Sequence, residues 1–145
     1  MDKSERGLTL IEVLVTVTIL SFIGVLIWNI FFQGVKYSHD SVSKNQMQQE
    51  ANIVVTYLTK THQISDKYTV NNSSCKIIVN SDKNGQKIFE NSQLCYSITI
   101  SPKGLGDEID PNKVDLSLKL AVYEKNNNHI QVTVDTLLYR IKGDS

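Results

Sequence analysis

The sequence predicts an α+β fold, in which a long N-terminal helix packs on a small antiparallel β-sheet head. Three observations predict this fold. An apolar block near the N-terminus continues into amphipathic, helix-forming sequence without an intervening proline. After about residue 73, apolar and polar residues alternate as they do in strands. The chain has 145 residues, which allows one ordinary domain and excludes a multidomain enzyme.

The charge balance and the residue content argue against several classes of function. The 15 basic residues balance the 15 acidic ones, so the chain lacks the strong positive field on which non-specific nucleic-acid binding relies. The three histidines, His39, His62 and His129, are far apart, and no metal-binding or nucleophile motif surrounds them. We therefore expect no enzyme activity, no cofactor and no direct nucleic-acid binding.

Residues 8–32 form the apolar block, in which Glu12 is the only ionisable side chain. A helix of this length spans about 37 Å, enough to cross a bilayer. The block is too long for the apolar part of a secretory signal peptide, and no small-residue cleavage site follows it. We expect a transmembrane helix that stays with the mature protein.

The Glu12 carboxylate requires a charged partner, access to water at the membrane interface, or protonation. A carboxylate one turn inside an apolar helix costs several kcal/mol, on the order of 3, unless it is paired, snorkels to the interface or is protonated. Gly7 stands just ahead of the apolar block. A glycine allows close approach to the backbone, although it is also compatible with an ordinary loop.

Residues 33–66 are expected to continue the helix in amphipathic form and to end it near residues 64–66. Met47, Ala51, Val54 and Leu58 recur at helical spacing and share one face, with Val55 and His62 beside it. A helix from residue 8 to about residue 65 would be about 85 Å long, far beyond the usual three or four turns. Such a length suits a filament subunit.

Residues 67–145 are expected to form the β-rich head. Short strands are predicted at residues 76–79, 86–89 and 96–100, with a tight turn over residues 81–85 that contains an Asn-Gly pair. The clearest alternation covers residues 114–122. A turn at residues 126–128 leads to a partner strand that starts near Ile130. With roughly 80 residues, the head needs the amphipathic half of the helix to complete its core.

Cys75 and Cys95 are the only cysteines, and each lies at the edge of a predicted strand. If the head lies outside the cytoplasm, a disulfide between them is expected. The alternative is a pair of buried free thiols, because two cysteines supply too few ligands for a closed zinc site.

Acidic side chains gather in the loop over residues 101–113. Asp107, Glu108, Asp110 and Asn112 offer the oxygen ligands that calcium prefers, which makes the three carboxylates weak calcium candidates. Their spacing matches no defined calcium loop. A solvated acidic turn is therefore favoured, and no metal site is expected.

Residues 6–14, with the sequence RGLTLIEVL, resemble the class III leader of type IV pilins and of the pseudopilins of type II secretion and DNA-uptake machines. The resemblance implies that residues 1–7 are a leader peptide, that a prepilin peptidase cuts between Gly7 and Leu8, and that it methylates the new amino terminus at Leu8. It also implies that Glu12 docks on the amino terminus of a neighbouring subunit. The family usually has Phe after the cut, where this chain has Leu8.

Residues 48–63 are similar to the second half of the first helix in J-type or W-type minor pseudopilins. A Gln-rich, Glu-containing stretch there leads into an apolar pair and a basic ending. The similarity favours a minor subunit over a major one.

The resemblance implies a structural subunit of a type IV pilus-like or secretion or DNA-uptake pseudopilus. Its expected partners are the prepilin peptidase, other pilin or pseudopilin subunits, an inner-membrane assembly platform and membrane lipid. The chain would cross the cytoplasmic membrane once, with its N-terminus cytoplasmic and its head outside, and then enter a periplasmic or cell-surface filament. The leader does not separate secretion, pilus and competence systems, since it is the same in all three.

A second function class remains open. The chain could be a single-pass membrane protein that never polymerises and whose small extracytoplasmic head binds a ligand or a partner. This alternative predicts that the chain is not cleaved.

Overall fold

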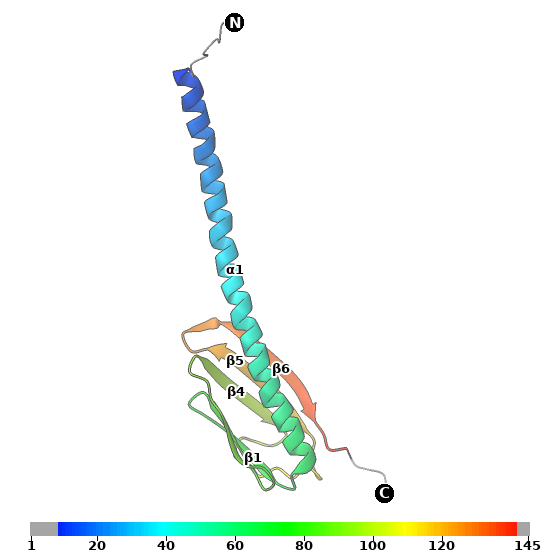
Figure 1. The fold of residues 1–145 in the computed structure, drawn as a ribbon. Helices are drawn as coiled ribbons and strands as arrows, with labels where there is room; N and C mark the ends of the chain where they lie inside the picture. The colour runs from blue at the N-terminus through cyan, green and yellow to red at the C-terminus, as the bar shows by residue number, and fades with distance from the viewer. Residues whose placement is uncertain (1–8, 142–145) are drawn as a thin grey trace. The chain divides into compact units, whose positions relative to one another are not determined.

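The computed structural model describes residues 9–141, and its elements confirm the α+β fold. One helix, α1 (Leu10–Ile64), precedes six strands. The strands are β1 (Tyr68–Ser73), β2 (Lys76–Ser81), β3 (Gly85–Phe89), β4 (Leu94–Ser101), β5 (Leu116–Glu124) and β6 (Asn127–Leu138) (Figure 1). The chain divides into two compact units between Asp40 and Ser41, and each is described by itself below.

The first unit is the apolar part of α1. Its side chains from Leu10 to Val35 are largely exposed, and within the described residues α1 is the one helix long and apolar enough to cross a membrane. The hydroxyl groups of Thr16 and Ser21 each donate to a carbonyl in the preceding turn, over 2.8 Å. These polar side chains are therefore satisfied inside the helix, as a lipid environment requires.

The second unit contains two three-stranded antiparallel sheets. The first sheet has the order β1-β2-β3 and the second the order β4-β5-β6. The sequence predicted one small sheet without indicating this division. At the junction, the Tyr96 backbone N–H donates to the Cys75 carbonyl over 3.3 Å, and the Asn72 side-chain amide donates to the Tyr96 carbonyl over 3.1 Å. These bonds satisfy backbone groups of β4 at its edge.

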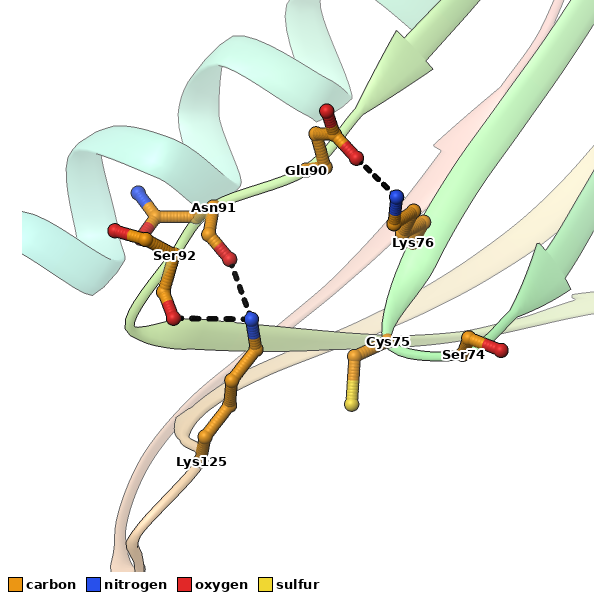
Figure 2. A pocket seen from close by; sticks show the side chains of 7 residues that line it. All are labelled: Ser74, Cys75, Lys76, Glu90, Asn91, Ser92 and Lys125. Atoms are coloured by element: carbon orange, nitrogen blue, oxygen red, sulfur yellow. Dashed lines mark hydrogen bonds and ion pairs between the residues drawn. The ribbon is translucent and has the colours of Figure 1, made fainter.

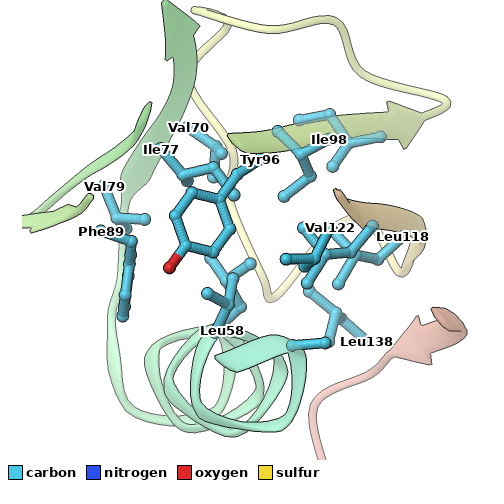
Figure 3. Packing of buried hydrophobic residues seen from close by; sticks show 14 of the residues in the cluster. Leu58, Val70, Ile77, Val79, Phe89, Tyr96, Ile98, Leu118, Val122 and Leu138 are labelled. Atoms are coloured by element: carbon cyan, nitrogen blue, oxygen red, sulfur yellow. The ribbon is translucent and has the colours of Figure 1, made fainter. Parts of the chain in front are cut away.

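The core lies between the sheets and the second half of α1. Met47, Ala51, Val54 and Leu58 have no exposed surface, which confirms the predicted helix face. In Figure 3, Leu58 meets Val79 and Phe89 of the first sheet on one side and residues of β5 and β6 on the other. Each fully buried side chain of this kind contributes about 1.5–3 kcal/mol relative to an exposed one.

Polar contacts fix the helix on the sheets. The Glu50 carboxylate accepts hydrogen bonds from the Tyr96 hydroxyl, over 3.0 Å, and from the Asn91 side-chain amide, over 3.2 Å. Near the end of α1, the Arg140 guanidinium donates to the Ser65 carbonyl over 2.8 Å. The helix is therefore held to β4 at one level and to the segment after β6 at another.

A disulfide joins Cys75 to Cys95, as expected from the sequence, with a Cα–Cα distance of 4.5 Å. Cys75 lies in the two-residue turn between β1 and β2, where Ser74 and Cys75 both have positive φ (49° and 64°). Paired positive φ angles are typical of tight hairpins. Because Cys95 lies in β4, the disulfide ties the first sheet covalently to the second.

Two strands, β1 and β6, differ from the sequence expectation by more than the one or two residues by which the bounds of the other strands shift. β1 was not predicted, because its second half, Asn71-Asn72-Ser73, favours turns. Antiparallel pairing with β2, which sets Val70 opposite Val79, stabilises this strand in spite of the local preference. β6 begins at Asn127, so the turn after β5 comes earlier than the predicted turn at residues 126–128.

The loop between β4 and β5 (residues 102–115) runs along the outer edge of β1. Backbone hydrogen bonds join Tyr68 and Ile109 in both directions, at 3.1 and 2.9 Å, and the Gly106 N–H donates to the Val70 carbonyl over 2.9 Å. The loop therefore pairs backbone groups that would otherwise face water at the edge of the sheet.

His62 is fully buried at the end of α1, where its Nδ1 lies 2.8 Å from the Tyr68 hydroxyl. Burial raises the pKa of Tyr68, so its hydroxyl stays protonated and can donate to Nδ1 of a neutral imidazole. Burial also lowers the pKa of His62, and Arg140 adds to this while Asp115 opposes it. The folded head therefore favours the uncharged imidazole.

We predict that acid destabilises the head through His62. Because the folded-state pKa lies below the unfolded value of 6.5, the stabilisation from neutral His62 is complete above pH 6.5 and is lost as the pH falls through the folded pKa. Thermal unfolding of the full chain in detergent, followed by circular dichroism between pH 7 and pH 5, measures this loss. The His62→Gln variant should lose less stability over that range; an equal loss in both proteins contradicts the assignment.

We also predict that the disulfide stabilises the head. It closes a loop with a sequence separation of 20 residues, for which the loss of unfolded-state entropy corresponds to about 3 kcal/mol. Chemical denaturation should show this deficit for the Cys75→Ala/Cys95→Ala protein. A reductant should lower the stability of the parent chain and leave the double variant unchanged. Equal stability of the oxidised parent and the double variant would refute the prediction.

Candidate functional site

Glu12 lies in the first turn of α1 and is the only ionisable side chain between Thr9 and Phe32. The Thr9 carbonyl accepts hydrogen bonds from the backbone N–H groups of Glu12, over 3.0 Å, and Val13, over 3.2 Å, which begins the helix. A carboxylate in the first turn interacts favourably with the helix dipole, by about 0.3–1 kcal/mol at an exposed site. That gain is smaller than the cost of placing the charge in lipid.

Glu12 is exposed and has exposed apolar neighbours on its own helix, Leu10, Ile11 and Val13 among them. Among residues 9–141, no lysine, arginine or histidine forms a salt bridge with it. Gly7 and Leu8, the expected cleavage and methylation positions, lie outside the described residues. The structure thus places one carboxylate in the first turn of an apolar helix. This helix follows the predicted leader peptide.

A second candidate, a cavity of about 380 Å³, lies beside the disulfide (Figure 2). Its charged groups already have partners. Lys76 forms an ion pair with Glu90, and the Lys125 ammonium donates to the carbonyls of Asn91, over 2.7 Å, and Ser92, over 3.0 Å. These bonds hold the turn between β3 and β4 against the end of β5, which is a structural role.

The three carboxylates of the loop between β4 and β5 each bind a different partner. Asp107 accepts a hydrogen bond from the Gly104 N–H over 2.8 Å, and Glu108 pairs with Lys67 over 2.7 Å. Asp110 pairs with Lys113 over 3.0 Å, which lowers the pKa of the Asp110 carboxyl. Within the part of the chain that the structure describes, no three His, Cys, Asp or Glu side chains form a group able to hold a metal ion. The loop does not gather its calcium candidates into a ligand set.

Sequence reasoning missed Glu50, whose carboxylate binds Tyr96 and Asn91. A signal was available, because Glu50 follows Met47 by three residues and precedes Val54 by four, so it lies on the buried helix face. A glutamate on that face requires a polar partner from the sheets. Its role in this structure is to position the helix.

Comparison with known proteins identifies the N-terminal segment. A family model described as the prokaryotic N-terminal methylation motif matches residues 2–28. No curated protein and no solved structure matches the chain. The matched segment contains Gly7, Leu8 and Glu12 and most of the apolar block. Together with the exposed apolar helix, it indicates membrane anchoring. The matched motif supports a type IV pilin-like class III leader at the N-terminus, as in precursors of the pilin or pseudopilin type.

Proposed function

We propose that the chain is a minor pilin or pseudopilin subunit that is cut after Gly7, methylated at Leu8 and assembled into a pilus-like filament or pseudopilus. The single observation that carries the proposal is Glu12, the one charge of an apolar helix, placed inside the methylation motif. The proposed regions are a leader (1–7), a transmembrane and polymerisation helix (8–32), an amphipathic helix (33–66) and a head (67–145).

Cleavage supplies the counter-ion that Glu12 lacks. The cut creates a positively charged amino group on Leu8, and methylation keeps that charge. Opposite charges within about 4–6 Å favour each other's ionised forms, which offsets the cost of the carboxylate in lipid. An incoming subunit whose Glu12 meets the amino terminus of a subunit already in place is therefore stabilised in the assembly and not outside it.

The disulfide supports a head outside the cytoplasm, because disulfides persist in oxidising compartments. In this proposal, the N-terminus begins on the cytoplasmic face, where the prepilin peptidase acts. The partners are other pilin or pseudopilin subunits, an assembly platform in the inner membrane and membrane lipid. The protein acts by assembly and has no catalytic role.

We predict that the mature chain begins with N-methylated Leu8. Mass spectrometry of the membrane-extracted protein from a host with the peptidase should find that terminus, and the Gly7→Val variant should retain Met1. Gly24→Val is the matched control, because no heavy atom lies within 4 Å of a Cβ built at Gly24. Met1 retained on the parent chain supports a non-polymerising membrane protein and contradicts the proposal.

We predict that Glu12→Ala is processed like the parent but incorporated beside wild-type subunits at least about tenfold less, which corresponds to about 1.4 kcal/mol. Glu12→Gln should show the same defect, since it keeps the shape and removes the charge. The measurement is the amount of tagged protein in sheared filament fractions. Incorporation equal to that of the parent removes Glu12 from the docking role.

A further inference from the structure

Three side chains with a carboxylate or a carboxamide group interrupt the apolar surface of α1 between Leu10 and Val35: Glu12, Asn29 and Gln33. The hydroxyl side chains of this segment donate to carbonyls of their own helix. Asn29 and Gln33 are exposed, and neither side chain forms a hydrogen bond with another residue of the described part of the chain. Because a carboxamide carries both N–H donors and a carbonyl acceptor, each of the two can bond a partner on another helix.

Water satisfies these two amides in a membrane but not among packed helices. Asn29 and Gln33 lie at the end of the apolar block that is farther from Glu12, and Trp28 precedes them. Tryptophan is enriched at the boundary between lipid and water, so headgroups and water are within reach of both amides there. When other helices surround α1, that water is displaced, and a buried amide without a hydrogen bond costs free energy. The amides therefore need partners in an assembly.

The contact proposed for Glu12 sets the offset between two parallel copies of α1. When Glu12 of one copy meets the amino terminus at Leu8 of another, each residue lies level with the residue four positions earlier in the neighbour. This offset corresponds to about 6 Å along the helix axis. It places Gln33 of the first copy level with Asn29 of its neighbour.

The two contacts also share one seam between the helices. Gln33 follows Glu12 by three heptads, and Asn29 follows Leu8 by three heptads. A straight helix drifts by about 20° per heptad. A left-handed crossing of about 20°, which is common between membrane helices, compensates for this drift and keeps residues at heptad spacing on the shared face. The two contacts are then about 32 Å apart along a single interface.

We propose that the side-chain amide of Gln33 forms a hydrogen bond with the side-chain amide of Asn29 in a second copy of this chain. The partner is a second copy because the chain itself carries the amide that the offset requires. Pairing without an offset would oppose two Glu12 carboxylates, and like charges repel. The inference rests on the proposed function and deepens it, since it adds a second contact to the interface that Glu12 begins. A contact between different residues of identical subunits can continue from copy to copy, as a filament requires.

Disulfide cross-linking in sheared filaments tests the offset and leaves both amides in place. Two differently tagged full-length chains carry Phe22→Cys and Leu26→Cys, respectively, in a host with the peptidase and the assembly machinery. Both residues are exposed and lie one heptad before Asn29 and Gln33, so the proposed offset sets them side by side. The native cysteines are already joined to each other.

The matched controls are two chains that both carry Phe22→Cys and two chains that both carry Leu26→Cys, because these pairs report an arrangement without an offset. We expect at least tenfold more cross-linked dimer from the mixed pair than from either control. Equal yields overturn the proposal, as does coupling of the cysteine variants to other filament subunits alone.

Removal of one amide tests the hydrogen bond itself. Asn29→Leu in the Phe22→Cys chain should lower the mixed-pair yield about threefold, the equivalent of about 0.6 kcal/mol for a hydrogen bond between membrane helices. The control exchanges the amides, with Asn29→Gln in the Phe22→Cys chain and Gln33→Asn in the Leu26→Cys chain. This exchange keeps one amide on each side and should retain the yield of the parent pair. An unchanged yield with Asn29→Leu overturns the proposal.

Measurement of leader processing and incorporation in the same samples separates this inference from the proposed function. Mature chains that begin at Leu8 and whose incorporation depends on Glu12, combined with equal cross-link yields, overturn the Gln33–Asn29 contact and leave the proposed function intact. Retention of Met1 overturns the proposed function, and the preference for the mixed pair should then be lost with it.

Discussion

The head depends on one helix face that fills the space between two small sheets. Three strands with a single apolar face are marginal by themselves and need a further layer. The buried side chains of α1, from Met47 to Leu58, supply that layer for both sheets at once. Glu50 then fixes the helix to β4 through the Tyr96 hydroxyl, and the Cys75–Cys95 disulfide joins the two sheets covalently. The helix is thus a component of the head's core.

The apolar part of α1, which forms the first unit, must suit lipid or other helices and not the core of the head. From Leu10 to Val35, its apolar side chains are exposed, and its threonine and serine hydroxyls are bonded within the helix. Lipid or other helices are the surroundings that suit such a surface. Glu12 is the exception, because lipid alone does not satisfy a carboxylate. The proposed function resolves this conflict with a positive charge that exists only after the leader is removed.

Much of this organisation could be predicted from the sequence because it depends on periodicity and local chemistry. The spacing of Met47, Ala51, Val54 and Leu58 predicts the buried face, and the Asn-Gly pair predicts the turn before β3. The leader resemblance points to Gly7, Leu8 and Glu12, and the family model supports that leader. The roles of the three residues stay predictions, because no structural observation tests them.

The remainder depends on contacts between distant residues. β1 exists because β2 pairs with it, although its Asn-Asn-Ser end favours a turn. The division into two sheets follows from which strands meet in space, and alternation within a strand carries no such information. The edge-to-face contact of Tyr57 of α1 with Phe89 of β3, with ring centres 5.3 Å apart, also joins residues that are distant in the sequence.

The central claim is that the Glu12 carboxylate meets the amino terminus of a neighbouring subunit. Zero-length carbodiimide coupling tests it in filaments that contain ¹⁴N- and ¹⁵N-labelled copies of this chain beside other subunits labelled with ¹⁴N, because the coupling joins a carboxylate only to an amine in direct contact. The account predicts peptides in mass spectra that join a ¹⁵N-labelled Glu12 segment to a ¹⁴N-labelled amino-terminal segment. Glu12 cross-links that join segments of one isotope only, or the absence of Glu12 cross-links from assembled material, would contradict it.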